Sequence, residues 1–220
     1  MTMHRPNTDK PTPIDGLQTL QQQLVELPSQ PRKIPPLEHW HPTSCGDMNL
    51  QIKANNEWWH EGRKVTRQSL VSLFAKVLWA QVDEQGQVSY YLKTPVEKWR
   101  IQVDDAPLLI TQVDQITEDG KTWLQFVTSQ GDVVKADAEH PIQLGLPFYQ
   151  THENAVPQAK QAQQPYLLVR QNGDSVLYGL LHRNVFYHLL NFGEFSEDEQ
   201  GTTLHLQSGE TRFDLTMSID

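Results

Sequence analysis

The sequence has almost no cysteine and no long hydrophobic run, and both absences narrow the possible classes of protein. Cys45 is the single cysteine of the 220 residues, so no disulfide can form within the chain and a thiolate metal site is disfavoured. No apolar segment approaches the roughly 20 residues that a transmembrane helix needs. The N-terminal segment is rich in Pro, Gln and Thr and lacks the apolar core of a signal peptide. We therefore expect a cytoplasmic protein without a membrane partner.

Positive charge is also scarce. The 18 basic residues are outnumbered by 27 acidic ones, which gives a net charge of −9. The negatively charged phosphate backbone of a nucleic acid attracts proteins with a net positive charge. We expect no nucleic-acid partner. The glycine-rich loops G-x-G-x-x-G and G-x-x-x-x-G-K-[ST] are absent as well, so a bound nucleotide would have to be held by side chains and turns. No cofactor is expected.

The N-terminal residues 1–33 are predicted to form a disordered tail followed by a docking helix. Residues 1–13 combine three prolines with few apolar side chains, too few to offset the entropy lost on ordering. Apolar residues then recur at helical spacing up to Pro28: Ile14, Leu17, Leu20, Leu24 and Leu27.

The rest of the chain predicts an α+β fold in two domains. Residues 34–149 indicate a hairpin, a helix beginning near Thr66 and continuing through Leu78, and then several antiparallel strands. Residues 150–165, rich in Gln, Ala and Pro, predict a linker. Residues 166–220 predict a second hairpin, helix and pair of strands.

The two domains share a pattern that suggests duplication. At one constant offset, five residues of the first hairpin (Leu50, Ile52, Lys53, Asn55 and Gly62) correspond to Leu167, Val169, Arg170, Asn172 and Gly179 of the second. A helix follows each hairpin. The alternative is that unrelated α+β hairpins share this pattern.

A charged stretch, YYLKTPVEKWRIQVDDAP at residues 90–107, is the strongest pointer to a site. Strand alternation puts Trp99 on an apolar face together with Glu97, and Lys98 and Arg100 on the opposite face. A buried carboxylate needs a partner, for which Arg67, Lys93 or a ligand are candidates. The alternative is a strand-end Glu97 that reaches water or a local ion pair.

Other polar residues invite a catalytic or metal-binding interpretation. His39, His41, Cys45 and Asp47 are potential metal ligands, but they lack the repeated spacing of zinc sites, so we expect no bound metal. Asp104 and Asp105 are neighbours that would point to opposite faces of a strand. We expect them to cap a turn.

Several motifs together resemble one bacterial family, known as domain of unknown function 1285. They are PLEHWHP, CGDMNLQI, YYLKTPVEKWRIQVDDAP, DAEHP and RNVFYHLL. The resemblance covers roughly residues 35 to 215, and TPVEK followed by DDAP is its most specific part. The family has no established activity. The resemblance implies a duplicated α+β architecture, a second domain loosely like a pleckstrin-homology barrel, and a site for a small, nucleotide-like ligand between the domains, with a role in signal transduction.

These observations favour a non-catalytic protein that binds a small anionic ligand. The candidate ligand-binding residues are Arg67, Lys93, Thr94, Glu97, Lys98, Trp99, Arg100, His140, Arg183 and Tyr187. One alternative is an enzyme acting on a phosphorylated or acyl substrate, with Glu97 as general base and Lys98 or Arg67 as electrostatic stabiliser. The other is an interaction module that binds a protein partner through its sheet edges.

Overall fold

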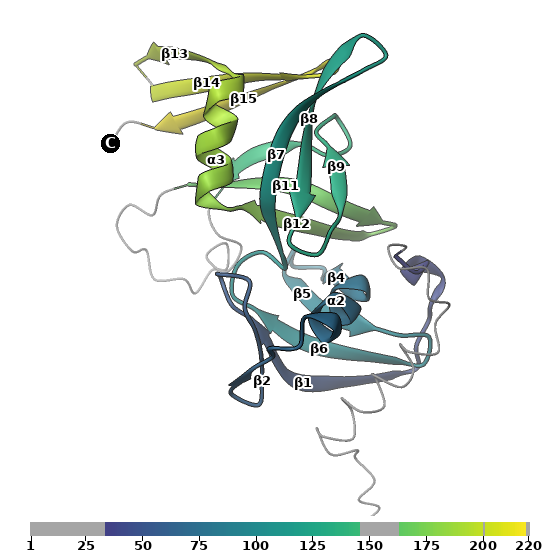
Figure 1. The fold of residues 1–220 in the computed structure, drawn as a ribbon. Helices are drawn as coiled ribbons and strands as arrows, with labels where there is room; N and C mark the ends of the chain where they lie inside the picture. The colour runs from purple at the N-terminus through teal and green to yellow at the C-terminus, as the bar shows by residue number, and fades with distance from the viewer. Residues whose placement is uncertain (1–33, 146–162, 200, 219–220) are drawn as a thin grey trace, which may run out of the picture.

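A computed structural model describes residues 34–145, 163–199 and 201–218. The predicted tail and docking helix at 1–33, and residues 150–162 of the predicted linker, lie outside the described residues. The described chain forms two β-rich halves stacked one on the other (Figure 1). No helix in this part of the chain is long and apolar enough to cross a membrane.

The first half is a six-stranded sheet with one helix on its inner face. A short 3-10 helix, η1 (Leu37–His39), precedes the sheet. The strands are β1 (Ser44–Ile52), β2 (Trp58–His60), β3 (Arg63–Lys64), β4 (Leu78–Val82), β5 (Val88–Lys93) and β6 (Glu97–Val103). The helix α2 (Gln68–Lys76) buries Val71, Phe74 and Ala75. The ring centroids of Phe74 and Trp58 lie 6.2 Å apart, which fixes α2 against the sheet.

The second half is another six-stranded sheet, followed by a helix and a small third sheet. The strands of the second sheet are β7 (Leu108–Glu118), β8 (Lys121–Thr128), β9 (Val133–Lys135), β10 (Ile142–Gly145), β11 (Gln164–Asn172) and β12 (Ser175–Leu181). After it come α3 (Arg183–Leu189), the 3-10 helix η3 (Leu190–Phe192), β13 (Glu194–Asp198), β14 (Gly201–Ser208) and β15 (Thr211–Ser218).

The two six-stranded sheets have the same topology. Their strand orders are β3-β2-β1-β6-β5-β4 and β9-β8-β7-β12-β11-β10, the second read in reverse. Each sheet consists of two three-stranded antiparallel meanders. The two meanders meet at the centre of the sheet, where β1 runs parallel to β6 in the first sheet and β7 runs parallel to β12 in the second. Two similar β-rich units of this kind are consistent with duplication.

The register of this repeat differs from the one predicted. The sequence analysis aligned the hairpin of β1 and β2 with that of β11 and β12, whereas the sheet topology matches β1 and β2 with β7 and β8. The helices also differ, because α2 lies between the two meanders of its sheet and α3 follows the second sheet. A short apolar hairpin pattern is too common to determine which strands correspond.

The third sheet, β13-β14-β15, is separate from the second. Ser208 on β14 connects the two, because its Oγ accepts a hydrogen bond from the Leu124 backbone N–H at 2.9 Å and donates to the Ala136 carbonyl at 2.7 Å. The described strands therefore form open sheets and no closed barrel. The pleckstrin-homology-like barrel is not confirmed.

The division between the halves falls near residues 104–107. Strands β7 to β10 were assigned to the first domain, with the boundary at 150–165, yet they pair with β11 and β12 in one sheet. Residues 164 and 165 are already part of β11. Antiparallel strands on both sides of the predicted boundary look alike in sequence, so the sequence did not reveal that β10 and β11 pair in one sheet.

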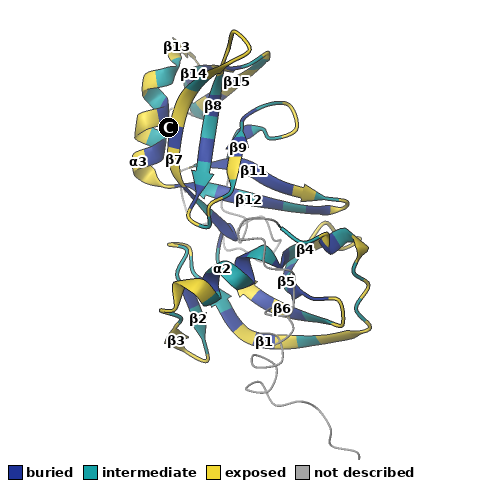
Figure 2. Cartoon of the chain, turned by 45° about the vertical axis from the view of Figure 1, so that its right-hand side comes forward, coloured by how far each residue is buried: buried dark blue, intermediate teal, exposed yellow. Residues whose placement is uncertain are grey.

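Buried contacts connect the two halves, as the dark residues at their junction in Figure 2 illustrate. The Ala80 backbone N–H of β4 donates to the Ser175 Oγ of β12 at 2.8 Å. Asp105, expected to cap a turn, is buried and accepts a hydrogen bond from the Tyr166 hydroxyl at 2.7 Å. The Arg170 guanidinium donates to the Ala75 carbonyl near the end of α2 at 2.5 Å. The halves thus share one continuous core.

Candidate functional site

Strand β6 has the two faces predicted by its alternation. Trp99 and Ile101 are buried, whereas Arg100 is exposed and Lys98 half-buried. Lys98 pairs across the sheet with Lys93 of β5, so both lysines extend from the outer face of the first sheet. The same face carries Tyr91 of β5 and Trp79 of β4, which are cross-strand partners.

Lys93 and Lys98 line a groove between the halves with a volume of about 640 Å³. One wall is the outer face of β4, including Trp79 and Gln81. A second wall comes from Glu38 and residues 40–42, and a third from the turn at Gly173–Asp174 between β11 and β12. We call this the lysine groove. It joins three segments that are distant in sequence.

The side chain of Lys93 is largely buried, and its ammonium group has no counter-ion among the described residues. Its residue is 6% exposed, and its Nζ lies 3.7 Å from the centroid of the Trp79 ring. Among the described residues, no acceptor hydrogen-bonds to this group and no carboxylate lies within ion-pair distance. Burial, and then the charge of Lys98, lower the pKa of Lys93 despite the opposing effect of the Glu38 carboxylate. An ammonium with only a ring as partner is an unusual occupant of a protein interior.

Lys98 is held at the edge of the same groove by two neighbours. Its Nζ donates to the Gln81 Oε1 at 2.8 Å and lies 4.4 Å from the centroid of the Tyr91 ring. An ammonium has three donors, so Lys98 can bind an anion without leaving Gln81.

Thr94 fixes the turn that aligns the two lysines. Its side chain is fully buried, and its Oγ1 donates to the Glu97 carbonyl at 3.0 Å and accepts from the Glu97 N–H at 3.0 Å. Pro95 limits the backbone freedom of the same turn. The predicted Thr-Pro step therefore contributes to the site by positioning Lys93 and Lys98 opposite each other.

Glu97 finds a partner other than those predicted. Its Oε2 accepts a hydrogen bond from the Trp99 indole N–H at 3.2 Å, two residues along the same face of β6. None of the described ion pairs involves Glu97. Neither Arg67 nor Lys93 is the partner, because a local contact satisfies the carboxylate.

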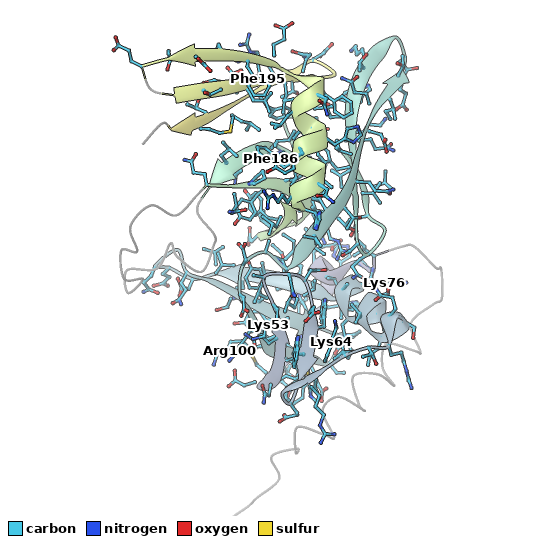
Figure 3. All side chains as sticks on the ribbon, turned by 60° about the vertical axis from the view of Figure 1, so that its left-hand side comes forward. Lys53, Lys64, Lys76, Arg100, Phe186 and Phe195 are labelled. Atoms are coloured by element: carbon cyan, nitrogen blue, oxygen red, sulfur yellow. The ribbon has the colours of Figure 1, made fainter. Side chains whose placement is uncertain are left out.

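The other predicted site residues lie away from the lysine groove. Arg67 is exposed at the start of α2, without a capping side chain. Arg100, labelled on the first half in Figure 3, pairs with Asp47 at 2.6 Å. Arg183 and Tyr187 hydrogen-bond to each other at 2.9 Å on the exposed side of α3.

His140 borders a different groove between the halves, on the side of α2. This groove has a volume of about 840 Å³ and is lined by α2, the β8–β9 turn and β11. The His140 Nδ1 lies 3.1 Å from Asp137, and the Arg170 guanidinium pairs with Asp132 at 2.8 Å. Arg170, the buried cation among the described residues that line this groove, therefore already has a counter-ion.

The residues suggested as metal ligands do not converge either. His41 lines the lysine groove, Cys45 is exposed, and Asp47 pairs with Arg100. No group of three or more His, Cys, Asp and Glu side chains in the described ranges could hold a metal ion.

Sequence reasoning missed Trp79 and Gln81. The predicted helix extended through Leu78, whereas α2 ends at Lys76 and β4 begins at Leu78. The sequence carries no period-2 signal here, because Leu78, Trp79 and Ala80 are three apolar residues in a row; the alternation in burial appears only in the structure.

A second polar cluster on the third sheet has the connectivity of a serine–histidine–aspartate triad. Ser196 Oγ lies 2.7 Å from Nε2 of His205, and Asp214 Oδ1 lies 2.6 Å from its Nδ1. However, an Arg212 nitrogen also lies 2.8 Å from Nδ1. Because a carboxylate only accepts and an arginine only donates, the two contacts of Nδ1 favour opposite tautomers, so they do not set up His205 as a base for Ser196. The cluster is also exposed. We assign the cluster a structural role across three strands.

Comparisons with known proteins agree with this architecture. The model of the domain of unknown function DUF1285, N-terminal domain, matches residues 35–106. The model of the protein of unknown function DUF1285, C-terminal domain, matches residues 107–215. The chain belongs to the DUF1285 family. The two models meet at residues 106 and 107, where the first sheet gives way to the second.

Two solved structures of DUF1285 proteins are similar to this chain. One, from Silicibacter pomeroyi DSS-3, has a TM-score of 0.69 at 30% identity and covers 91% of this chain and 95% of its own. The other, from Shewanella baltica OS155, has a TM-score of 0.43 at 26% identity and covers 66% of this chain and 91% of its own. No curated protein matches. The description of the DUF1285 family states no activity, so the proposed function rests on the geometry of the lysine groove.

Proposed function

We propose that the protein binds a small anionic molecule in the lysine groove without catalysing a reaction on it. The observation that carries the proposal is the Lys93 ammonium, which has no counter-ion among the described residues although the Lys93 side chain is largely buried. Charges that are removed from water are normally paired, because an isolated one costs several kcal/mol. A bound anion would supply the missing partner.

The surroundings of Lys93 support the same ligand class. Lys98 adds a second cation, and Trp79 and Trp40 add aromatic surface. The groove volume of about 640 Å³ is within the range of roughly 300–1,000 Å³ that is typical of small-molecule sites. Cations beside aromatic surface suit a nucleotide-like molecule, whose phosphate needs charge-assisted hydrogen bonds and whose base needs a flat apolar contact.

We further propose that binding serves as a signal. The groove is built from both halves, so an occupant would contact β4 of the first half and the Gly173–Asp174 turn of the second. A ligand that contacts both halves favours the arrangement in which those contacts form. The proposal includes a cytoplasmic setting, supported by the single exposed Cys45, and a loose pleckstrin-homology likeness of the second half, supported by its two sheets beside α3.

Neither alternative gains comparable support. For the enzyme, the general base Glu97 is engaged by the Trp99 indole. For the interaction module, β13 is an edge strand exposed along its length, but it carries Glu194, Glu197 and Asp198, and charged side chains on an edge oppose strand pairing.

A thermal-shift screen tests the proposal. The panel contains inorganic phosphate, nucleotides, cyclic nucleotides and phosphorylated metabolites. At about 100 times Kd a ligand adds roughly 2.7 kcal/mol to the free energy of unfolding, which corresponds to a rise in Tm of roughly 5–10 °C for a chain of this size.

Three variants make the screen specific. The shift should disappear in Lys93→Met and Lys98→Ala, and persist in Arg67→Ala, which removes a cation outside the groove. If no compound in the panel raises the Tm, or if the rise in Tm persists in both lysine variants, binding in the lysine groove is contradicted.

A further inference from the structure

The side chain of Lys93 has the features of a reactive amine as well as those of an anion-binding group. It is 6% exposed, lines the lysine groove, and contacts the Trp79 ring rather than a carboxylate. A lysine becomes nucleophilic when it is desolvated or lies beside another cation. Lys93 meets both conditions, because Lys98 is its direct cross-strand partner.

Only the uncharged amine attacks a carbonyl carbon. Burial and the neighbouring Lys98 charge lower the pKa of Lys93, so more of it is uncharged near neutral pH than of an ordinary lysine. Lys64 and Lys121, by contrast, are exposed and pair with the carboxylates of Glu57 and Glu210. The environment therefore distinguishes Lys93 from these lysines.

We propose that Lys93 forms a reversible imine with a small carbonyl compound that also carries a carboxylate or phosphate, and that Lys98 holds the anionic group. This inference rests on the proposed function and narrows its ligand class. The two lysines have distinct tasks. Lys98 keeps its hydrogen bond to Gln81 and uses its remaining donors on the anion, while the carbonyl carbon is presented to the Lys93 Nζ.

The chemistry needs no oxidant or cofactor. The nitrogen lone pair of Lys93 attacks the carbonyl carbon, a C–N bond forms, and the carbonyl oxygen takes up the proton that the nitrogen loses. The resulting carbinolamine then loses its hydroxyl group together with the remaining hydrogen of the nitrogen as water, the C–O bond breaks, and a C=N bond is left. Hydrolysis reverses each step, so the ligand is bound covalently and released unchanged.

Reductive trapping tests this inference on the full chain. The probe is glyoxylate, a small aldehyde carboxylate, and the matched control is propanal, an aldehyde without charge. Cyanoborohydride reduces any imine to a stable amine, and peptide mass spectrometry gives the extent of modification of each lysine. Because a held carbonyl has a high effective concentration, glyoxylate should modify Lys93 at least about tenfold more than Lys64 or Lys121.

Substitution on β6 adds a second readout. Lys98→Gln should reduce the modification of Lys93 by glyoxylate to the level of the exposed lysines. Arg100→Gln, which removes a positive charge from the same strand outside the groove, should leave the preference for Lys93 intact. Propanal, which Lys98 cannot hold, should show a much smaller preference for Lys93 than glyoxylate shows in the wild-type protein.

The outcomes separate this inference from the proposed function. If phosphate raises the Tm of the wild-type protein but glyoxylate modifies Lys93 no more than Lys64, the imine is wrong and anion binding stands. If neither effect is seen, both proposals fail. If propanal prefers Lys93 as strongly as glyoxylate does, or if the preference of glyoxylate survives Lys98→Gln, the role given to the anionic group is wrong.

Discussion

Lys93 and Lys98 are directly opposite each other on β5 and β6, as cross-strand partners in an antiparallel pair. Like charges in this relationship destabilise a sheet. Each ammonium instead contacts an aromatic ring of the same face, Lys93 that of Trp79 and Lys98 that of Tyr91. A cation over an aromatic face is worth about 0.5–2 kcal/mol, which offsets the repulsion without neutralising either charge. The two positive charges therefore remain close together, and it is on this arrangement that the proposal of anion binding rests.

The repulsion between the two lysines predicts the effect of removing one charge. Lys98→Gln should raise the pKa of Lys93, because the second-largest cause of its lowering is gone while burial remains. The pKa is followed by NMR of the lysine side chains. Arg100→Gln is the matched control and should change the Lys93 pKa less. Equal effects of the two substitutions would show that the protein's overall charge, rather than the cross-strand contact, acts on Lys93.

The lowered pKa also predicts a pH dependence of stability. Between the pKa of Lys93 in the folded protein and its ordinary value of 10.5, the unfolded chain carries a proton that the folded protein does not. The free energy of unfolding contributed by Lys93 therefore rises with pH across this window. Urea titrations should show this rise in the wild type and a flatter profile in Lys93→Met. Parallel profiles for the two proteins would mean that Lys93 titrates normally.

The buried ion pair at the other groove predicts a large loss of stability. Arg170 donates to Asp132 through Nε and Nη2, at 2.9 Å each, and both side chains are largely buried. Arg170→Met leaves the Asp132 carboxylate without its partner, which costs about 3–5 kcal/mol in urea denaturation.

Two further variants test that explanation. Adding Asp132→Asn should recover part of the loss, because the unpaired charge is removed. Arg100→Met breaks the exposed pair with Asp47 and should leave stability unchanged within error. If the double variant loses as much free energy of unfolding as the two single variants lose together, the two residues do not act as one ion pair.

Close packing at the parallel strand pair predicts the effect of one added methyl group. A Cβ on Gly46 of β1 would lie 2.6 Å from a ring carbon of Trp99 on β6. Gly46→Ala should therefore destabilise the protein by about 1–3 kcal/mol. Gly145→Ala is the control, since its Cβ would meet Tyr166 no closer than 3.9 Å. Chemical denaturation that ranks the two substitutions in the opposite order would contradict this packing.

The sequence predicted those parts of the fold and site that depend on local pattern. The two faces of β6 follow from strict alternation between Trp99 and Arg100, and the turn before β6 follows from the Thr94–Pro95 step. Family membership followed from motifs along the whole chain, and it is confirmed by matches that span residues 35–215.

Long-range pairing could not be predicted in the same way. The parallel contacts of β1 with β6 and of β7 with β12 join the strands that come first and last in the sequence of each sheet. Nothing in a short apolar pattern specifies these contacts. Lys93 is buried in a groove whose other walls come from residues 38–42 and from Gly173–Asp174. Its lack of a counter-ion appears only when these segments are brought together.

The pKa of Lys93 with and without inorganic phosphate is the most direct test of the lysine groove. We expect phosphate to raise it, because a bound anion supplies the counter-charge that the described residues lack. Lys64, already paired with Glu57, serves as an internal control and should move less. Side-chain NMR reads both lysines in one sample. A Lys93 pKa that phosphate leaves unchanged, or moves no more than that of Lys64, would contradict anion binding at Lys93.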